Sequence, residues 1–236
     1  IIRGRRFVIA TGSRPAIPSI PGLDEAGYET NETIFKRHDL PRSLAVIGGG
    51  PVGVELAQAF SRLGSKVTIV EAAPRLLGHA DSVAAETLAQ CLAAEGIQLY
   101  LSSGISTVRR AGDHRQLQLE NGSTIDCERI LVATGRRPAV HGLGLAAAGV
   151  EHDHRGIKVD ARMRTSRRHI YAVGDVCGPL QFTHVAEYQA GIGLANLVFR
   201  LPKMADYRVV PTVVYTDPEV AMVGLTEQQA QAAGIK

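Results

Sequence analysis

Cysteine is scarce in this sequence, and its scarcity excludes several kinds of site. The 236 residues include only three cysteines, Cys91, Cys127 and Cys177. They are far apart and match neither the ligand spacing of a metal site nor a disulfide framework. We therefore expect reduced cysteines that act as small, buried hydrophobic side chains in a cytoplasmic protein.

A strong net charge and a long apolar run are also missing. The formal net charge is only +3, and the arginine pairs are scattered without aromatic residues between them, so nucleic-acid binding is not expected. No apolar run approaches the ~20 residues that cross a bilayer, and no signal peptide opens the sequence, so no membrane association is expected. His152 and His154 lack a third ligand nearby, so no metal site is predicted.

What is present is typical of a soluble α/β protein with short connections. Hydrophobic residues make up 45% of the sequence and charged residues 21%, and the 25 glycines and 11 prolines indicate many tight turns. The sequence opens at Ile1 without a methionine and stops at Lys236, where a predicted helix finishes. We therefore expect a fragment of a longer chain.

Strands and helices are predicted to alternate between residues 41 and 137. The apolar run 44–48 is typical of a strand buried on both faces of a parallel sheet. Apolar residues at helical spacing from Val52 to Leu63 predict a helix that Gly64 ends, and a second helix is capped by Asp81. Further strands are expected at 66–70 and at about 97–101, 105–110, 115–119 and 130–133, with a hairpin turn at Asn121-Gly122.

Two apolar strands stop at the same dipeptide. Phe7–Ala10 runs into Thr11-Gly12, and Ile130–Ala133 runs into Thr134-Gly135. This echo predicts two nucleotide-binding sheets, one closing near residue 12 and the other near residue 135. Beyond residue 138 we expect an Ala- and Gly-rich loop, a strand at 156–160 and an apolar strand from Ile170 that runs into a turn at Gly174-Asp175. A helix at about 183–199, a β-rich stretch at 209–215 and a final helix with a Thr226–Gln229 capping box should follow.

The segment after the first predicted strand fits a dinucleotide site. Gly48, Gly50 and Gly53 satisfy G-x-G-x-x-G between a buried strand and an amphipathic helix. The three glycines would serve the tight turn, the approach of the pyrophosphate and the packing of helix on strand, in that order. The helix N-terminus at Pro51, Val52 and Gly53 would offer free N–H groups to the phosphates.

An acidic residue follows at the spacing where dinucleotide-binding folds place a carboxylate that hydrogen-bonds the ribose. Glu71 ends the next strand, 23 positions after Gly48. Its carboxylate can accept both ribose hydroxyls of an adenosine and would repel a 2′-phosphate, which favours NADH over NADPH. Ala72, Ala73 and Pro74 offer no basic group for such a phosphate, whereas Arg75 is the residue that could reverse the preference.

Several motifs together resemble one family, the class I pyridine-nucleotide-disulfide oxidoreductases. They are Ala10–Pro15, Leu44–Ala57, Ala133–Pro138, Tyr171–Asp175 and Tyr215–Ala221. Within the family the sequence is most similar to mercuric reductases and next to dihydrolipoamide dehydrogenases. The resemblance implies an α/β fold in which a Rossmann-like NAD(P)-binding domain is inserted into part of an FAD-binding α/β domain, followed by the start of an α+β interface domain. The implied segments are 1–40 (end of the first FAD-domain segment and linker), 41–137 (NAD(P)-binding domain), 138–203 (second FAD-domain segment) and 204–236 (incomplete interface domain).

The resemblance also implies roles for particular residues. Gly174 and Asp175 would hold FAD, with Asp175 accepting a hydrogen bond from the ribityl chain, and the helix that begins near Thr183 would face the flavin. Thr11-Gly12 and Thr134-Gly135 would approach the flavin and the nicotinamide nucleotide, respectively. Glu55 would lie near the nicotinamide and flavin rings, although a solvated helix glutamate is an open alternative.

The sequence departs from the family in what it lacks. The flavin-binding fingerprint, the redox cysteine pair and the catalytic His-Glu pair have no counterpart, so no catalytic residue is assigned and FAD is expected to bind weakly or not at all. The parent enzyme would be a homodimer that passes hydride from NADH to FAD and then reduces a disulfide or metal substrate such as Hg(II). A stand-alone NADH-sensing module and a flavoprotein without the disulfide remain alternatives, and Tyr215-Thr216-Asp217-Pro218 argues against the second.

Overall fold

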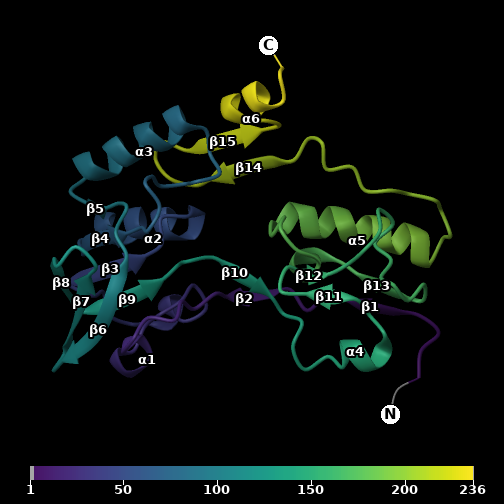
Figure 1. The fold of residues 1–236 in the computed structure, drawn as a ribbon, viewed down its shortest axis with the longest axis horizontal. Coiled ribbons are helices and arrows are strands. Elements are labelled where there is room, and N and C mark those ends of the chain that lie inside the picture. Colours follow the sequence, from purple (N-terminus) through teal and green to yellow (C-terminus); the bar gives the residue numbers. More distant parts are fainter. Residues whose placement is uncertain (1–2, 236) are drawn as a thin grey trace. The chain divides into compact units, whose positions relative to one another are not determined.

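The computed structural model of the chain describes residues 3–235. These residues divide into two compact units (Figure 1). Unit 1 holds residues 3–14 and 136–210, and unit 2 holds residues 15–135 and 211–235. Unit 2 thus contains the stretch 15–40 and the C-terminal hairpin in addition to most of the predicted NAD(P)-binding segment, and the assignment of these pieces to functional domains stays a prediction.

A four-stranded parallel sheet forms the centre of unit 2. Its order is β5-β4-β3-β9, and its strands are β3 (Ser43–Ile47), β4 (Lys66–Val70), β5 (Gln98–Tyr100) and β9 (Arg129–Val132). Because successive side chains of a strand point to opposite faces, Leu44 and Val46 enter one hydrophobic core while Ala45 and Ile47 enter another. Burial on both faces explains why β3 is an unbroken apolar run.

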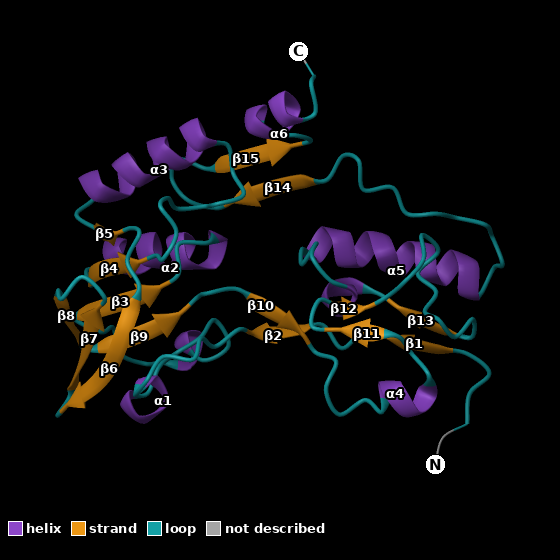
Figure 2. Ribbon diagram, in the orientation of Figure 1, coloured by secondary structure: helices purple, strands orange, loops and turns teal. Residues whose placement is uncertain are grey.

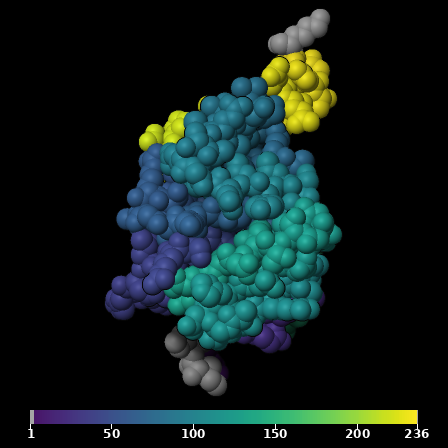
Figure 3. Space-filling view, turned by 90° about the vertical axis from the view of Figure 1, so that its left-hand side faces the viewer, coloured from purple at the N-terminus to yellow at the C-terminus, as the bar shows by residue number. Residues whose placement is uncertain are grey.

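Two layers cover the parallel sheet (Figure 2). On one face lie α2 (Pro51–Arg62) and α3 (Ser82–Ala94), which share the core of Leu44 and Val46. The other face is covered by an antiparallel sheet of β6 (Ile105–Ala111), β7 (His114–Leu119) and β8 (Thr124–Cys127). In the space-filling view α3 lies in the upper part of the face shown and the antiparallel sheet below it (Figure 3).

The ends of these elements follow the predicted local signals. The Asp81 side chain accepts a hydrogen bond from Val83 N–H at the start of α3. Gly64, with φ 110°, follows α2, and Gly122, with φ 87°, turns the chain from β7 to β8. These positive φ values are the reason for glycine at both positions.

The remaining elements of unit 2 are short. They are α1 (Leu23–Ala26), the 3₁₀ helix η1 (Ile34–Lys36), the antiparallel hairpin β14 (Pro211–Val214) and β15 (Val220–Val223), and α6 (Glu227–Ala232). Val214 and Val220 of the hairpin join the core that contains α2 and α3. The capping box of Thr226 and Gln229 is present, which confirms that prediction.

Unit 1 contains the second predicted sheet. β1 (Phe7–Ile9) pairs in parallel with β13 (Ile170–Ala172), so the two strands that stop at Thr-Gly belong to different sheets, as the echo predicts. The other elements are β2 (Ser13–Pro15) paired with β10 (Arg136–Pro138), β11 (His152–Asp153) paired with β12 (Gly156–Ile157), α4 (Leu145–Ala148), the 3₁₀ helix η2 (Gly174–Cys177) and α5 (Thr183–Leu197).

Two expectations for unit 1 were wrong. The strand expected at 156–160 is limited to the two residues of β12, because Asp160 N–H instead bonds the Arg164 carbonyl in a turn. The stretch expected as a loop contains α4, a single helical turn between Gly144 and Gly149, which have φ 64° and 68°. Such short elements carry no periodic signal in the sequence.

Residues 3–235 contain neither a membrane-spanning helix nor a metal-binding cluster of side chains. No helix there is both long and apolar enough to span a membrane. No group of three His, Cys, Asp or Glu side chains is arranged to bind a metal ion.

The cysteines are free, but their surroundings differ. Cys127 is buried, whereas Cys91 and Cys177 are partly exposed. Although Cys177 is partly exposed as a residue, desolvation of its thiol and of the Cys127 thiol raises the pKa of both groups to about 12. Both thiols are therefore protonated and unreactive at neutral pH.

We expect iodoacetamide at pH 8 to label Cys91 before the other two cysteines. In the folded chain Cys127 and Cys177 should react at least roughly tenfold more slowly than Cys91, because only the thiolate attacks. Mass spectrometry of tryptic peptides measures the three rates, and the denatured chain, in which the rates should converge, is the control. Labelling of Cys127 as fast as that of Cys91 in the folded chain would contradict this picture.

Candidate dinucleotide-binding site

The turn between β3 and α2 brings helix and strand into close contact. Gly48 has φ 109°, and a Cβ at this position would lie 2.5 Å from the carbonyl oxygen of Ala133. A Cβ on Gly53 would overlap the carbonyl oxygen of Gly48. Both positions therefore require glycine, for the tight turn and for helix packing, as the fingerprint predicts.

Gly50 differs from the other two glycines because the space around it is open. It precedes the helix in an extended conformation, with φ −77° and ψ −179°, and a Cβ there would meet no atom within 4 Å. The first helical bond runs from Val54 N–H to Gly50 O, with Pro51 at the first helical position. The N-terminal amides of α2 therefore lie beside free space of the kind that a pyrophosphate would occupy.

Glu71 lies against this turn. Its Oε2 accepts a hydrogen bond from Gly49 N–H at 2.6 Å, and its Oε1 accepts one from Ala73 N–H at 2.7 Å. A carboxylate oxygen has about two acceptor positions, so each oxygen keeps one for a ligand. Two free positions on one fixed carboxylate match the two hydroxyls of a ribose diol.

The Thr134-Gly135 segment extends the same edge of the sheet. Ala133 N–H bonds the carbonyl of Ile47, which keeps the segment alongside the end of β3. The Thr134 hydroxyl donates to the carbonyl of Ala16 at 2.7 Å, and Ala16 N–H donates to Gly135 O at 2.9 Å. Gly135, with φ 114°, then redirects the chain.

Glu55 is engaged with the C-terminal hairpin. Its Oε1 accepts a hydrogen bond from Tyr215 N–H at 2.9 Å. Farther along α2, Gln58 bonds both backbone groups of Asp217, and Arg62 forms an ion pair with its carboxylate at 2.9 Å. One face of α2 therefore fixes residues 215–217, so Glu55 is neither a freely solvated side chain nor without a partner. Its nearness to the nicotinamide stays a prediction.

In unit 1, Asp175 belongs to a polar cluster that sequence reasoning did not find. The Ser13 hydroxyl donates to Asp175 Oδ2 at 2.6 Å, and Arg136 Nε donates to the Ser13 oxygen at 2.6 Å. Arg136 Nε also lies 3.9 Å from Asp175 Oδ2. Ser13 and Arg136 follow the two Thr-Gly dipeptides, so the echo was the signal that could have suggested this meeting.

The other predicted flavin residues, Thr11, Gly12, Gly174 and Thr183, also belong to unit 1. The Thr11 hydroxyl donates to the carbonyl of Ala139, and Gly12 has φ 70°. Gly174, with φ 78°, donates its N–H to the Gln189 side chain of α5 at 2.7 Å. Thr183 is the first residue of α5, and no side chain caps this helix N-terminus.

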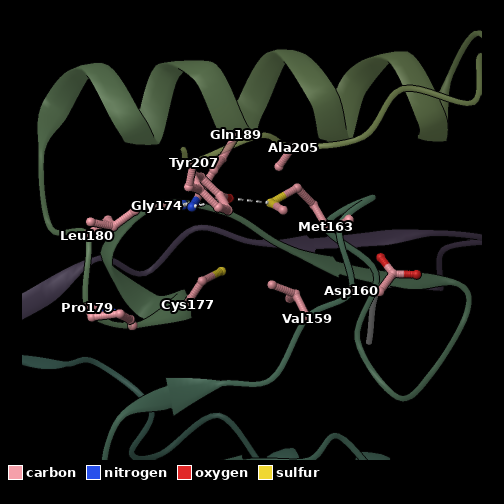
Figure 4. Close-up of a pocket in the computed structure, with 12 residues that line it drawn as sticks. Val159, Asp160, Met163, Gly174, Cys177, Pro179, Leu180, Gln189, Ala205 and Tyr207 are labelled. Carbon is pink, nitrogen blue, oxygen red and sulfur yellow. Dashed lines mark hydrogen bonds between the residues drawn. The ribbon is translucent and has the colours of Figure 1, made fainter. Parts of the chain in front are cut away.

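A cavity of about 400 Å³ lies beside Gly174 in unit 1 (Figure 4). Apolar side chains, among them Val159 and Met163, form much of its wall, and Cys177 contributes its thiol. Near the top of the view Gln189 donates to the Tyr207 hydroxyl at 2.9 Å, and the dashed line that ends on Met163 joins this hydroxyl to the Met163 sulfur at 3.8 Å. Apart from Gly174, no predicted site residue lines this cavity.

Comparison with known families identifies the chain. A family model described as pyridine nucleotide-disulphide oxidoreductase matches residues 2–190. The chain belongs to this oxidoreductase family. A model described as the dimerisation domain of the same family matches residues 210–236.

Relatives in this oxidoreductase family have longer chains than this one. A mercuric reductase of Bacillus cereus is 40% identical over 99% of this chain and 38% of its own length. A dihydrolipoyl dehydrogenase of Thermus scotoductus is 40% identical over 97% of this chain and 50% of its own length. The structure of the HOCl-induced flavoprotein disulfide reductase RclA from Escherichia coli matches with a TM-score of 0.92 at 33% identity, covering 99% of this chain and 54% of that one. The chain therefore spans about half the length of such relatives, or less.

Two glycine substitutions should separate the binding role of this turn from its packing role. Gly50→Ala should lower the free energy of unfolding by no more than about 1 kcal/mol. It should nevertheless weaken NADH binding at least roughly tenfold, because the methyl group would occupy the space of the pyrophosphate. Gly53→Ala, the matched control, should cost about 2 kcal/mol or more of stability through overpacking. Urea unfolding and calorimetric titration measure both effects. Unchanged NADH affinity in Gly50→Ala would place the pyrophosphate elsewhere.

Proposed function

We propose that this chain binds NADH and forms the NADH-binding part of an FAD-dependent oxidoreductase. The observation that carries the proposal is the turn at 48–53, where steric contact demands Gly48 and Gly53 while open space surrounds Gly50. Packing does not require glycine at this position, because a Cβ would fit there, whereas close approach of a pyrophosphate to the backbone would require it. Family membership supports the same reading.

The surroundings of Glu71 favour NADH over NADPH. Its carboxylate lies at the end of β4, where a 2′-phosphate on the adenosine ribose would meet like charge. Arg75 is the one basic side chain of the following loop, residues 72–78, and its Nη2 donates to the carbonyl of Gly78 at 3.0 Å. Glu71 thus supplies the carboxylate, and the arginine of the following loop is directed toward the loop's own backbone.

Flavin would be held by unit 1. When bound, FAD and the nicotinamide supply hydride and electron-transfer chemistry. Asp175, fixed by Ser13, is suited to accept a hydrogen bond from a polyol, and the uncapped N-terminus of α5 is suited to a partial negative charge. The residues of this chain bind and orient, and none of them is assigned a catalytic step.

The electron acceptor and the oligomeric state are properties of the longer parent enzyme. We propose a homodimeric, cytoplasmic parent that reduces a disulfide or a metal substrate such as Hg(II). Support comes from the match of residues 210–236 to a dimerisation domain, from the names of the relatives and from the free cysteines, which suit a reducing compartment. A stand-alone NADH-sensing module is the second candidate, because the whole coenzyme turn lies within unit 2.

Calorimetric titration should show tighter binding of NADH than of NADPH. We expect Glu71→Ala to weaken NADH binding by roughly tenfold and to remove the preference for NADH over NADPH, since the ribose hydroxyls lose their hydrogen-bond acceptor. The control is Glu86→Ala, which removes the same charge from an exposed position on α3 and should leave both affinities unchanged. Tenfold tighter binding of NADPH to the wild type would reverse the proposed preference.

The chain should lose flavin during purification. Asp175 and the N-terminus of α5 would contact only part of an FAD molecule, and the sequence offers a single glycine fingerprint, which the proposed NADH site would use. Absorbance at the flavin band, compared with protein concentration, measures retention. Material that is bright yellow at stoichiometric FAD would contradict this expectation.

A further inference from the structure

Two residues beside Glu71 have a backbone conformation that residues with a Cβ rarely adopt. Among the described residues, the non-glycine positions with positive φ are Leu77 at 48°, Ser102 at 48°, Met163 at 64° and Arg200 at 57°. The left-handed region is unfavourable for such residues and persists only where the surroundings enforce it. In unit 2, both left-handed residues contact the segment around Glu71.

Ser102 is connected to the Glu71 carboxylate through Ala73. Glu71 N–H bonds Tyr100 O and continues the parallel ladder of β4 and β5. One more regular step would direct Ser102 N–H to Glu71 O. Instead Ser103 N–H takes that acceptor, and the left-handed Ser102 donates to Ala73 O at 2.9 Å. Ala73 N–H in turn donates to Glu71 Oε1 at 2.7 Å.

Leu77 is connected to the same carboxylate through Gly49. Its N–H donates to Gly49 O at 2.9 Å, and Gly49 N–H donates to Glu71 Oε2 at 2.6 Å. A Cβ on Gly49 would lie 2.5 Å from Leu76 Cδ2, so the loop closes tightly over this peptide. Each carboxylate oxygen therefore accepts from the N–H of a residue, Gly49 or Ala73, whose own carbonyl accepts from the N–H of a left-handed residue.

We propose that Ser102 and Leu77 are positioning residues that fix the Glu71 carboxylate for the ribose diol of the coenzyme. The two relays orient both oxygens before any ligand arrives, so binding would not have to order this side chain. The inference rests on the proposed function, and it assigns the effect to backbone conformation and not to the Ser102 hydroxyl.

Substitutions at Ser102 test the proposal because this side chain is exposed. Ser102→Gly and Ser102→Asn tolerate a positive φ and should keep NADH and ADP-ribose affinity within about twofold. Ser102→Val, whose branched side chain disfavours a positive φ, should weaken the binding of both ligands about fivefold. In a Glu71→Ala background the same change should have no further effect, since the relay then has no carboxylate to position.

The matched control is Arg200→Val, which places valine at an exposed left-handed position of unit 1 and should not alter affinity. Full affinity in a folded Ser102→Val chain would overturn the proposal. An equal loss of affinity in Ser102→Gly would also overturn it, and so would a Ser102→Val effect that stays undiminished in the Glu71→Ala background. If the wild type binds neither ligand, the proposed function itself fails, whereas binding that depends on Glu71 but not on Ser102 removes only this inference.

Amide hydrogen exchange of the unliganded wild type tests the same idea without any variant. The Gly49 and Ala73 amides should be protected before NADH is added, because both already donate to Glu71. Protection that develops only with NADH would show that the ligand, and not the relays, orders the carboxylate.

Discussion

The close approach of α2 to the end of β3 is the constraint on which the candidate dinucleotide-binding site depends. Gly53 lies so close to the carbonyl of Gly48 that no side chain fits between them. The helix N-terminus is thereby held beside the open space at Gly50. Gly48 N–H also bonds Val70 O, which ties the turn to the end of β4. One steric contact thus brings the helix amides and the Glu71 carboxylate to the same edge of the sheet.

Unit 1 fixes its acidic residue by a different means. Asp175 accepts a hydrogen bond from the Ser13 hydroxyl, which itself accepts one from Arg136, a residue 123 positions farther along the sequence that also forms an ion pair with Asp175 at 3.9 Å. Partly buried carboxylates need such partners, because desolvation of an unpaired charge is unfavourable. Glu71 relies on backbone N–H groups within its own neighbourhood instead. The two carboxylates therefore differ in how a substitution nearby would affect them: Asp175 depends on side chains and Glu71 on backbone conformation.

The predictability of each feature depended on how local its cause was. The strands of the parallel sheet, α2, α3 and the two capping signals follow from apolar periodicity and from glycine or Asp81 at element ends, and these appear in the structure as expected. The length of β12 was overestimated and the single-turn α4 was missed, because such short elements depend on contacts with distant segments. Likewise, the bond from Glu55 to Tyr215 joins residues 160 positions apart, and no local pattern indicates it.

The sequence by itself determined the strand, the glycine turn, the helix and the acid at the end of the next strand. Each of these depends on side-chain periodicity or on the steric need for glycine, which act over a few residues. Only the tertiary structure decided which peptide groups hold Glu71, why Ser102 and Leu77 are left-handed, and that Ser13 and Arg136 meet at Asp175. Those features depend on hydrogen bonds between distant segments, whose partners are defined only once the sheets have formed and brought the segments together.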